Sequence, residues 1–123
     1  MTKIGISPSN GQFKIVEDKY LIGKSDPDKD EFDILLFACR DIKEISIPSN
    51  IKIISSFAFE NCSKLTKVEI QPNSNLQTID EYAFSGSKIE EIYFPTSLKE
   101  LKYGWCSDTS NLTKIGISPS NGQ

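Results

Sequence analysis

The chain has no histidine among its 123 residues, and this absence removes several kinds of chemistry. Histidine is the usual general base near neutral pH, the partner of catalytic serine and cysteine, and the commonest metal ligand. The sequence also lacks any apolar run near the roughly 20 residues that a membrane-spanning helix needs. A net charge of −3 gives little attraction to nucleic acid or to anionic membranes. We therefore expect a soluble, non-catalytic domain that uses no cofactor or metal, binds no nucleic acid and inserts into no membrane.

The beginning of the chain also lacks the charged start and apolar centre of a signal peptide, so we expect no targeting signal in it. The composition, in contrast, is that of a folded domain, with 37% hydrophobic and 25% charged residues. The length is near the common size of one domain. We expect a single domain over residues 1–123.

The two ends of the chain have the same sequence. Thr2–Gln12 and Thr113–Gln123 both read TKIGISPSNGQ, and the two copies lie 111 residues apart. Drifting natural repeats rarely keep eleven consecutive identities, polar positions included. We favour a unit cut from a longer array, or a chain built deliberately so that its end repeats its beginning, over a natural intact chain.

A shorter period lies inside the long one. Its central apolar residue recurs at Ile45, Val68, Ile92 and Ile115, in steps of 23, 24 and 23 residues. The chain then divides into a partial repeat over 1–12, an insertion over 13–41, repeats over 42–64, 65–88 and 89–111, and a partial repeat over 112–123.

Each repeat is predicted to form one coil of a solenoid. The segment I-x-I-P alternates apolar and polar residues, as a half-buried strand does, and proline then ends the strand because it has no N–H to donate. The following I-x-x-I segment returns behind the strand, and an Ala-Phe pair such as Ala58-Phe59 closes the coil. Stacked coils bury a continuous core, so equivalent strands align in parallel about 4.8 Å apart.

The insertion is predicted to begin with a β-hairpin. Phe13–Val16 and Tyr20–Gly23 are short apolar segments that flank a polar turn. Ser25–Glu31 is a charged, proline-containing loop, and Phe32–Ala38 is apolar enough for a strand or a short helix. The repeat register resumes at Cys39. We expect the hairpin to project sideways from the solenoid and to pack on its body, because an isolated hairpin is marginally stable.

The spacing I-x-I-P-x-x-I-x-x-I-x-x-x-A-F-x-x-C-x-x-L over residues 45–65 resembles the BspA-like leucine-rich-repeat family. The inserted segment, with Ile22-Gly23-Lys24-Ser25 and the stretch from Phe37 to Ile42, resembles the trichomonad surface-protein version of that family. The third repeat departs from the pattern, with Gly104-Trp105-Cys106 in place of the Ala-Phe pair.

This resemblance implies a fold and a biological setting. The fold would be a leucine-rich-repeat solenoid, mainly β within the α/β class. It would have a concave parallel sheet, an irregular or short-helical convex side and the β-hairpin insertion. The setting would be the cell surface or the extracellular space in the parent protein, with binding to host, matrix or neighbouring-cell proteins and a role in adhesion.

The outward positions of the predicted concave sheet form two rows of candidate partner-binding residues. The first row alternates in charge, so neighbouring strands can form a ladder of ion pairs, each contributing only about 0.2–1 kcal/mol. In the second row Tyr93 is the natural anchor for a partner protein. An ordinary solvated sheet face is the alternative. The candidates are Glu44, Lys67, Glu91 and Lys114 in the first row and Ser46, Glu69 and Tyr93 in the second, which Gly116 completes.

The terminal strands are candidates for self-assembly. Ile4, Ile6, Ile115 and Ile117 lie on strands with open edges, and neither end has an evident polar capping repeat. Because the two ends are identical in sequence, one molecule's tail can replace another's head. A homo-oligomer that pairs head-to-tail or exchanges strands is therefore the alternative function.

The charged loop contains alternating aspartates. Asp26-x-Asp28-x-Asp30 is similar to the start of a calcium-binding loop, but Glu31 and Phe37 stand where that loop needs glycine and glutamate. A solvated acidic loop is the favoured interpretation.

The three cysteines, Cys39, Cys62 and Cys106, have no zinc-site spacing. Cys39 and Cys62 share a repeat position, so we expect them to be stacked in the interior as reduced thiols. A disulfide between them is the alternative if the parent protein is exported.

Overall fold

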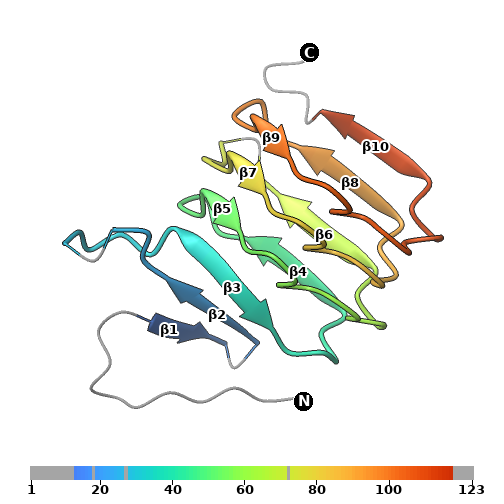
Figure 1. Ribbon diagram of the computed structural model, residues 1–123, viewed down its shortest axis with the longest axis horizontal. Coiled ribbons are helices and arrows are strands. Elements are labelled where there is room, and N and C mark those ends of the chain that lie inside the picture. Colours follow the sequence, from blue (N-terminus) through green and yellow to red (C-terminus); the bar gives the residue numbers. More distant parts are fainter. Residues whose placement is uncertain (1–12, 18, 27, 72, 118–123) are drawn as a thin grey trace.

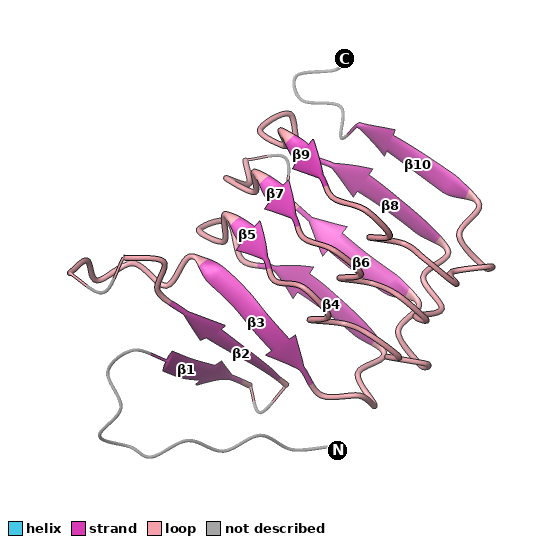
Figure 2. Cartoon of the chain, viewed as in Figure 1, coloured by secondary structure: helices cyan, strands magenta, loops and turns pink. Residues whose placement is uncertain are grey.

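The chain folds as a β-solenoid of two facing sheets in a computed structural model that describes residues 13–117, except Asp18, Pro27 and Pro72 (Figures 1 and 2). The first sheet has four parallel strands in the order β10-β8-β6-β4. Its strands are β4 (Glu44–Ile47), β6 (Lys67–Ile70), β8 (Glu91–Phe94) and β10 (Lys114–Ile117). This is the predicted concave sheet, built from the I-x-I segments.

The second sheet faces the first and has six strands in the order β1-β2-β3-β5-β7-β9. The last four of these run parallel to one another. The strands are β1 (Phe13–Val16), β2 (Tyr20–Gly23), β3 (Ile34–Ala38), β5 (Ile53–Ile54), β7 (Thr78–Ile79) and β9 (Glu100–Leu101). The described residues contain no helix, so the convex side consists of short strands and turns rather than short helices.

Alternation of side chains explains the four-stranded sheet. In β4, β6 and β8 the burial pattern is exposed, buried, exposed, buried. Ile45 pairs with Val68, and Ile115 pairs with Ile92, so the central residues of the predicted repeats lie side by side. A strand with one face on a core fixes its register in this way, because a slip of one residue would expose every apolar side chain.

Aromatic rings stack through the interior between the two sheets. The rings of Phe59 and Phe84 are parallel with centroids 4.8 Å apart, and both side chains are fully buried. Trp105 continues this stack edge-on, with its centroid 6.4 Å from that of Phe84 and 5.4 Å from that of Phe94. Burial of each large apolar side chain contributes roughly 1.5–3 kcal/mol, so this column stabilises the stacking of the coils.

The third repeat keeps the turn but shifts its residues. The N–H of Phe59 donates to the carbonyl of Ala83, and the N–H of Phe84 donates in the same way to the carbonyl of Trp105. Phe59 and Phe84 are thus equivalent donors, so their acceptors, Ala83 and Trp105, occupy equivalent positions in successive turns. The next residue, Cys106, then occupies the position equivalent to Phe84. The large indole then occupies a position that alanine fills in the other repeats, which fits its partial exposure.

The hairpin forms as predicted, but it does not project sideways. β1 and β2 pair antiparallel, and β2 also pairs antiparallel with β3, so the hairpin extends the six-stranded sheet. The edge of β3 offers unpaired backbone groups, and pairing with β2 satisfies them. β3 itself is a strand and already pairs in parallel with β5, from Ile34 opposite Ile53. The solenoid thus begins one strand earlier than Cys39.

Cys39 and Cys62 are buried, as expected, and no disulfide joins them. The Sγ of Cys62 lies 3.8 Å from the carbonyl oxygen of Cys39. The Arg40 guanidinium donates to the carbonyls of Ala38 and Ala58, each at 3.1 Å, and so covers the first turn of the ladder. Burial raises the pKa of the Cys62 thiol, and this effect outweighs the lowering effect of Arg40. The raised pKa keeps the thiol protonated at neutral pH.

Candidate functional site

The exposed side chains of the four-stranded sheet lie in the two predicted rows. Strand pairing sets Glu44 beside Lys67, Lys67 beside Glu91, and Glu91 beside Lys114. We call this surface the concave face and define it by its exposed side chains: Glu44, Ser46, Lys67, Glu69, Glu91, Tyr93 and Lys114. The rows come from the strand period alone, because alternate residues of a strand point to one side.

The first row alternates in charge but does not form a ladder of close ion pairs. In the described part of the chain no lysine nitrogen of this row lies within 4.0 Å of a carboxylate oxygen of the row. The carboxylate of Glu91 instead accepts a hydrogen bond of 3.0 Å from the hydroxyl of Tyr93, two residues along the same strand. Exposed charges gain little from a fixed pairing, since water solvates them well.

Tyr93 lies across the neighbouring strand. A Cβ atom at Gly116 would lie 3.0 Å from Cδ1 of the Tyr93 ring. The ring can pack over this position because glycine has no side chain. The hydrogen bond to Glu91 raises the pKa of the Tyr93 hydroxyl. With 41% of its surface exposed, Tyr93 presents a broad aromatic face whose hydroxyl is held in one direction.

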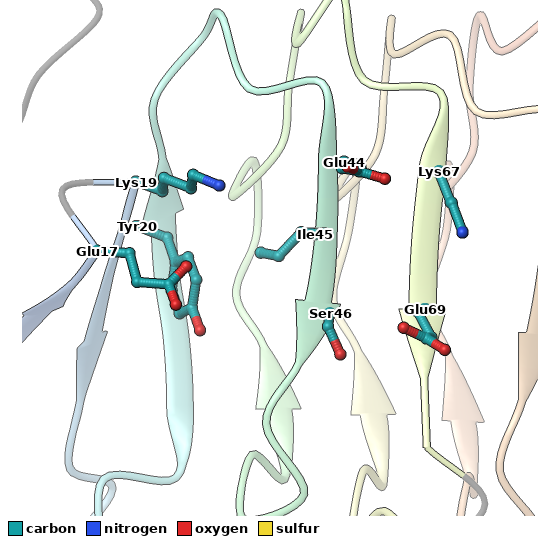
Figure 3. A pocket seen from close by; sticks show the side chains of 8 residues that line it. All are labelled: Glu17, Lys19, Tyr20, Glu44, Ile45, Ser46, Lys67 and Glu69. Carbon is teal, nitrogen blue, oxygen red and sulfur yellow. The ribbon is translucent and has the colours of Figure 1, made fainter.

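A cleft of about 360 Å³ opens at the β4 end of the concave face (Figure 3). One side is the turn of the hairpin, with Glu17, Lys19 and Tyr20. The other side is the sheet, with Glu44, Ile45 and Ser46 on β4 and Lys67 and Glu69 on β6. Sequence reasoning did not find this cleft, because it depends on the packing of the hairpin.

The predicted assembly residues divide into two pairs. Ile115 and Ile117 lie on the end strand β10, with 57% and 63% of their surface exposed, because no described coil covers them. Ile4 and Ile6 lie outside the described residues.

Other patterns of the sequence give no site with converging ligands. The carboxylate of Asp26 accepts a hydrogen bond of 3.0 Å from the N–H of Asp28, a contact that is common in turns. Within residues 13–117, where described, no group of three or more carboxylate, thiol or imidazole side chains is placed to hold a metal ion. No described helix is long and apolar enough to cross a lipid bilayer.

A row of aromatic residues with exposed members at both ends, which sequence reasoning missed, lies on the turns. The rings of Phe57 and Tyr82 are stacked with centroids 5.6 Å apart, and Tyr103 meets Tyr82 edge-on at 5.8 Å. Tyr103 is 78% exposed. The signal was available in the sequence, since Phe57 and Tyr82 both stand directly before the Ala-Phe pair.

Comparison with known proteins identifies the same kind of repeat. The family model described as "BspA type Leucine rich repeat region" matches residues 33–122 in six copies. No curated protein matches the chain.

Solved structures of bacterial leucine-rich-repeat proteins share the fold. A leucine rich cell surface protein from Faecalibacterium prausnitzii aligns with 64% of the chain at 22% identity and a TM-score of 0.57. The pneumococcal vaccine antigen PcpA aligns with 79% at 23% identity and a TM-score of 0.65. The leucine rich repeat protein of T. pallidum aligns with 89% at 18% identity and a TM-score of 0.53.

The lengths of these proteins differ from that of the chain. The matched region is 21% of the Faecalibacterium protein, 24% of the pneumococcal antigen and 70% of the T. pallidum protein. The chain thus matches about a fifth to a quarter of the first two.

Proposed function

The chain belongs to the BspA-type leucine-rich-repeat family, and from this membership we propose that it is a non-catalytic protein-interaction module that binds a partner protein through its concave face. The observation that carries the proposal is an exposed aromatic anchor beside a row of alternating charges on one sheet. Tyr93 supplies aromatic area at low entropic cost, and the surrounding charges orient a partner.

We also propose that the parent protein displays this module on the cell surface and that its binding serves adhesion to host, matrix or neighbouring-cell proteins. The description of the Faecalibacterium protein as a cell surface protein supports this setting. A solenoid suits display, because each coil adds area to one continuous face.

The exposed aromatic residues supply the test. Y93A removes the anchor of the concave face, whereas Y103A removes a tyrosine that is more exposed but stands on the turns. Binding of labelled chain to purified extracellular-matrix proteins and to intact epithelial cells is measured for both variants. We expect Y93A to weaken binding about tenfold or more, as loss of an interface anchor does, and Y103A to leave it unchanged. The proposal would be contradicted if Y93A and Y103A bound equally well, or if only Y103A lost binding.

Self-assembly through the ends is a second candidate function. The observation that favours it is the exposure of Ile115 and Ile117 on β10, an end strand with no described neighbour on its outer edge. Exposed apolar edge strands are common sites of pairing between chains.

A further inference from the structure

We propose that the outer edge of β4, with which no described strand pairs, accepts the β10 strand of a second copy of this chain as a parallel neighbour. The inference rests on the second candidate function, self-assembly through the ends. It adds the acceptor, the donor and the register to that function, and it makes the contact head-to-tail rather than symmetric.

The two ends of the described solenoid are complementary halves of one coil. In each complete coil a strand of the four-stranded sheet is followed by a strand of the six-stranded sheet, as β4 is followed by β5. At one end, β3 extends the six-stranded sheet beyond β5, while the four-stranded sheet stops at β4. At the other end, β10 extends the four-stranded sheet, and no described strand follows it in the other sheet. What one end lacks, the other end therefore supplies.

The existing contact between β10 and β8 supplies the register. Lys114 pairs with Glu91 and Ile115 pairs with Ile92. The strand β4 begins as β8 does, with a glutamate followed by an isoleucine, at Glu44 and Ile45. A Lys-Ile-Gly-Ile strand seated on β4 in this register sets a lysine beside Glu44 and continues the alternating charges of the first row. Opposite charges directly across a strand pair favour this register over its alternatives.

The cleft beside β4 suits a strand that carries one positive charge. Three of its side chains, Glu17, Glu44 and Glu69, are carboxylates, and two, Lys19 and Lys67, are ammonium groups. Lys114 of the incoming strand balances this excess of negative charge. Figure 3 shows the charged side chains of β4 and β6 on one side of the cleft and those of the hairpin turn on the other.

Burial of apolar surface supplies the driving force, and the hairpin limits it. Ile115 and Ile117 are more than half exposed on β10, and pairing with β4 removes part of their surface from water. Because β2 already covers the edge of β3, only the four-stranded sheet continues across the junction. We therefore expect a small interface and a weak contact that depends on concentration.

Charge reversal on each side of the junction gives the experiment. E44K places two lysines across the junction, and K114E places two glutamates there. We expect each variant alone to associate roughly threefold to thirtyfold more weakly than the wild type. This loss of affinity corresponds to replacing the attraction of one exposed ion pair by a repulsion of similar size. A mixture of the two variants contains one intact β10 and one intact β4 edge, so mixing restores heterodimers. Sedimentation velocity from about 10 µM to about 1 mM covers the range expected for a small interface.

Matched controls keep the interpretation specific. E81K and K88E make the same changes of charge at exposed residues away from the β4 and β10 edges, and we expect both to associate as the wild type does. Circular dichroism melting confirms that all four variants are folded.

Three results would overturn the inference, and they differ in what they leave standing. If E44K and K114E each associate as strongly as the wild type, the chain assembles through another edge, and self-assembly survives without this acceptor. If the mixture fails to associate while the wild type does, the contact is not head-to-tail.

The third such result is a wild type that remains monomeric throughout, which overturns both the inference and the candidate function.

Discussion

At the scale of single residues, Asp33 shows how a charged loop is tied to the solenoid. Its side chain is 4% exposed, and its carboxylate accepts hydrogen bonds from the N–H and the hydroxyl of Ser25. Its carbonyl accepts from the N–H groups of Lys52 and Ile53, at the start of β5. Both ends of the Ser25–Asp33 loop are therefore held by one buried acidic residue.

The hydrogen bonds of Asp33 predict a pH-dependent stability. Burial alone would raise the pKa of Asp33, but the hydrogen bonds from Ser25 and the charge of Lys52 outweigh it and hold the pKa below its ordinary value of 3.8. A carboxyl whose pKa is lowered by folding stabilises the fold above its ordinary pKa, and this contribution disappears as the pH falls through the lowered value.

Substitution of Ser25 tests this contribution. We expect S25A to lower the free energy of unfolding by about 1 kcal/mol at pH 7, where the ionised carboxylate loses one donor. We expect the difference from the wild type to shrink below about pH 4, as the carboxyl becomes protonated. Urea unfolding at pH 7 and at lower pH measures both effects, and S56A is the control at an exposed serine. A difference that stays constant with pH would show that Asp33 is not the group involved.

At the scale of elements, the turns that close the coils depend on left-handed backbone at two repeated positions. The N–H of Tyr82 donates to the carbonyl of Tyr103, which aligns Tyr82 with Gly104. The first position has φ values of 62°, 57° and 68° at Phe57, Tyr82 and Gly104. The second has φ values of 57°, 74° and 58° at Asn61, Gly86 and Asp108. Side chains other than glycine adopt this region at a cost, so the turns tolerate some residues better than others.

Two substitutions within one turn should therefore differ in their effect on stability. A Cβ atom at Gly104 would lie 2.5 Å from Cε1 of Tyr82. We expect G104A to lower the free energy of unfolding by about 1–3 kcal/mol, through this overlap and the positive φ. D108G relieves a positive φ in the same turn, and we expect it to be neutral or to stabilise by up to about 1 kcal/mol. Chemical denaturation compares the two variants, and a loss with D108G equal to that with G104A would contradict the argument.

The elements also show what sequence reasoning reaches. The strands of the concave face were predictable, because alternation along one strand depends only on which side meets the core. The rows of Glu44 and Ser46 followed from the same period. The contact of Tyr93 with Gly116 was within reach as well, since both residues stand in the second row.

Other elements were beyond the sequence for physical reasons. The two-residue strands of the convex side have no period of their own, and they form because neighbouring coils align their backbones. The placement of the hairpin on β3 is a choice between sheet edges, which no local pattern encodes. The cleft beside β4 depends on that choice, so it was missed with it.

At the scale of the whole molecule, stability should propagate along the solenoid from coil to coil. Each coil packs mainly on its neighbours, as the stack from Phe59 through Phe84 to Trp105 shows. In such proteins the stability is close to a sum of coil terms and neighbour terms. The end near β10 contributes exposed apolar residues, so it should open before the middle.

Substitutions in the middle and at the end of this stack separate local from global opening. Phe84 is fully buried with ring neighbours on both sides, so we expect F84A to cost about 3–5 kcal/mol and to lower amide protection in every strand. Trp105 is partly buried and packs against Phe84 and Phe94. We expect W105A to cost less and to lower protection in β8 and β10, while β2, β3 and β4 keep theirs. Hydrogen exchange strand by strand measures the pattern. If W105A lowers protection in β2–β4 as much as in β8–β10, the chain opens as a single cooperative unit, and coupling between neighbouring coils does not limit its opening.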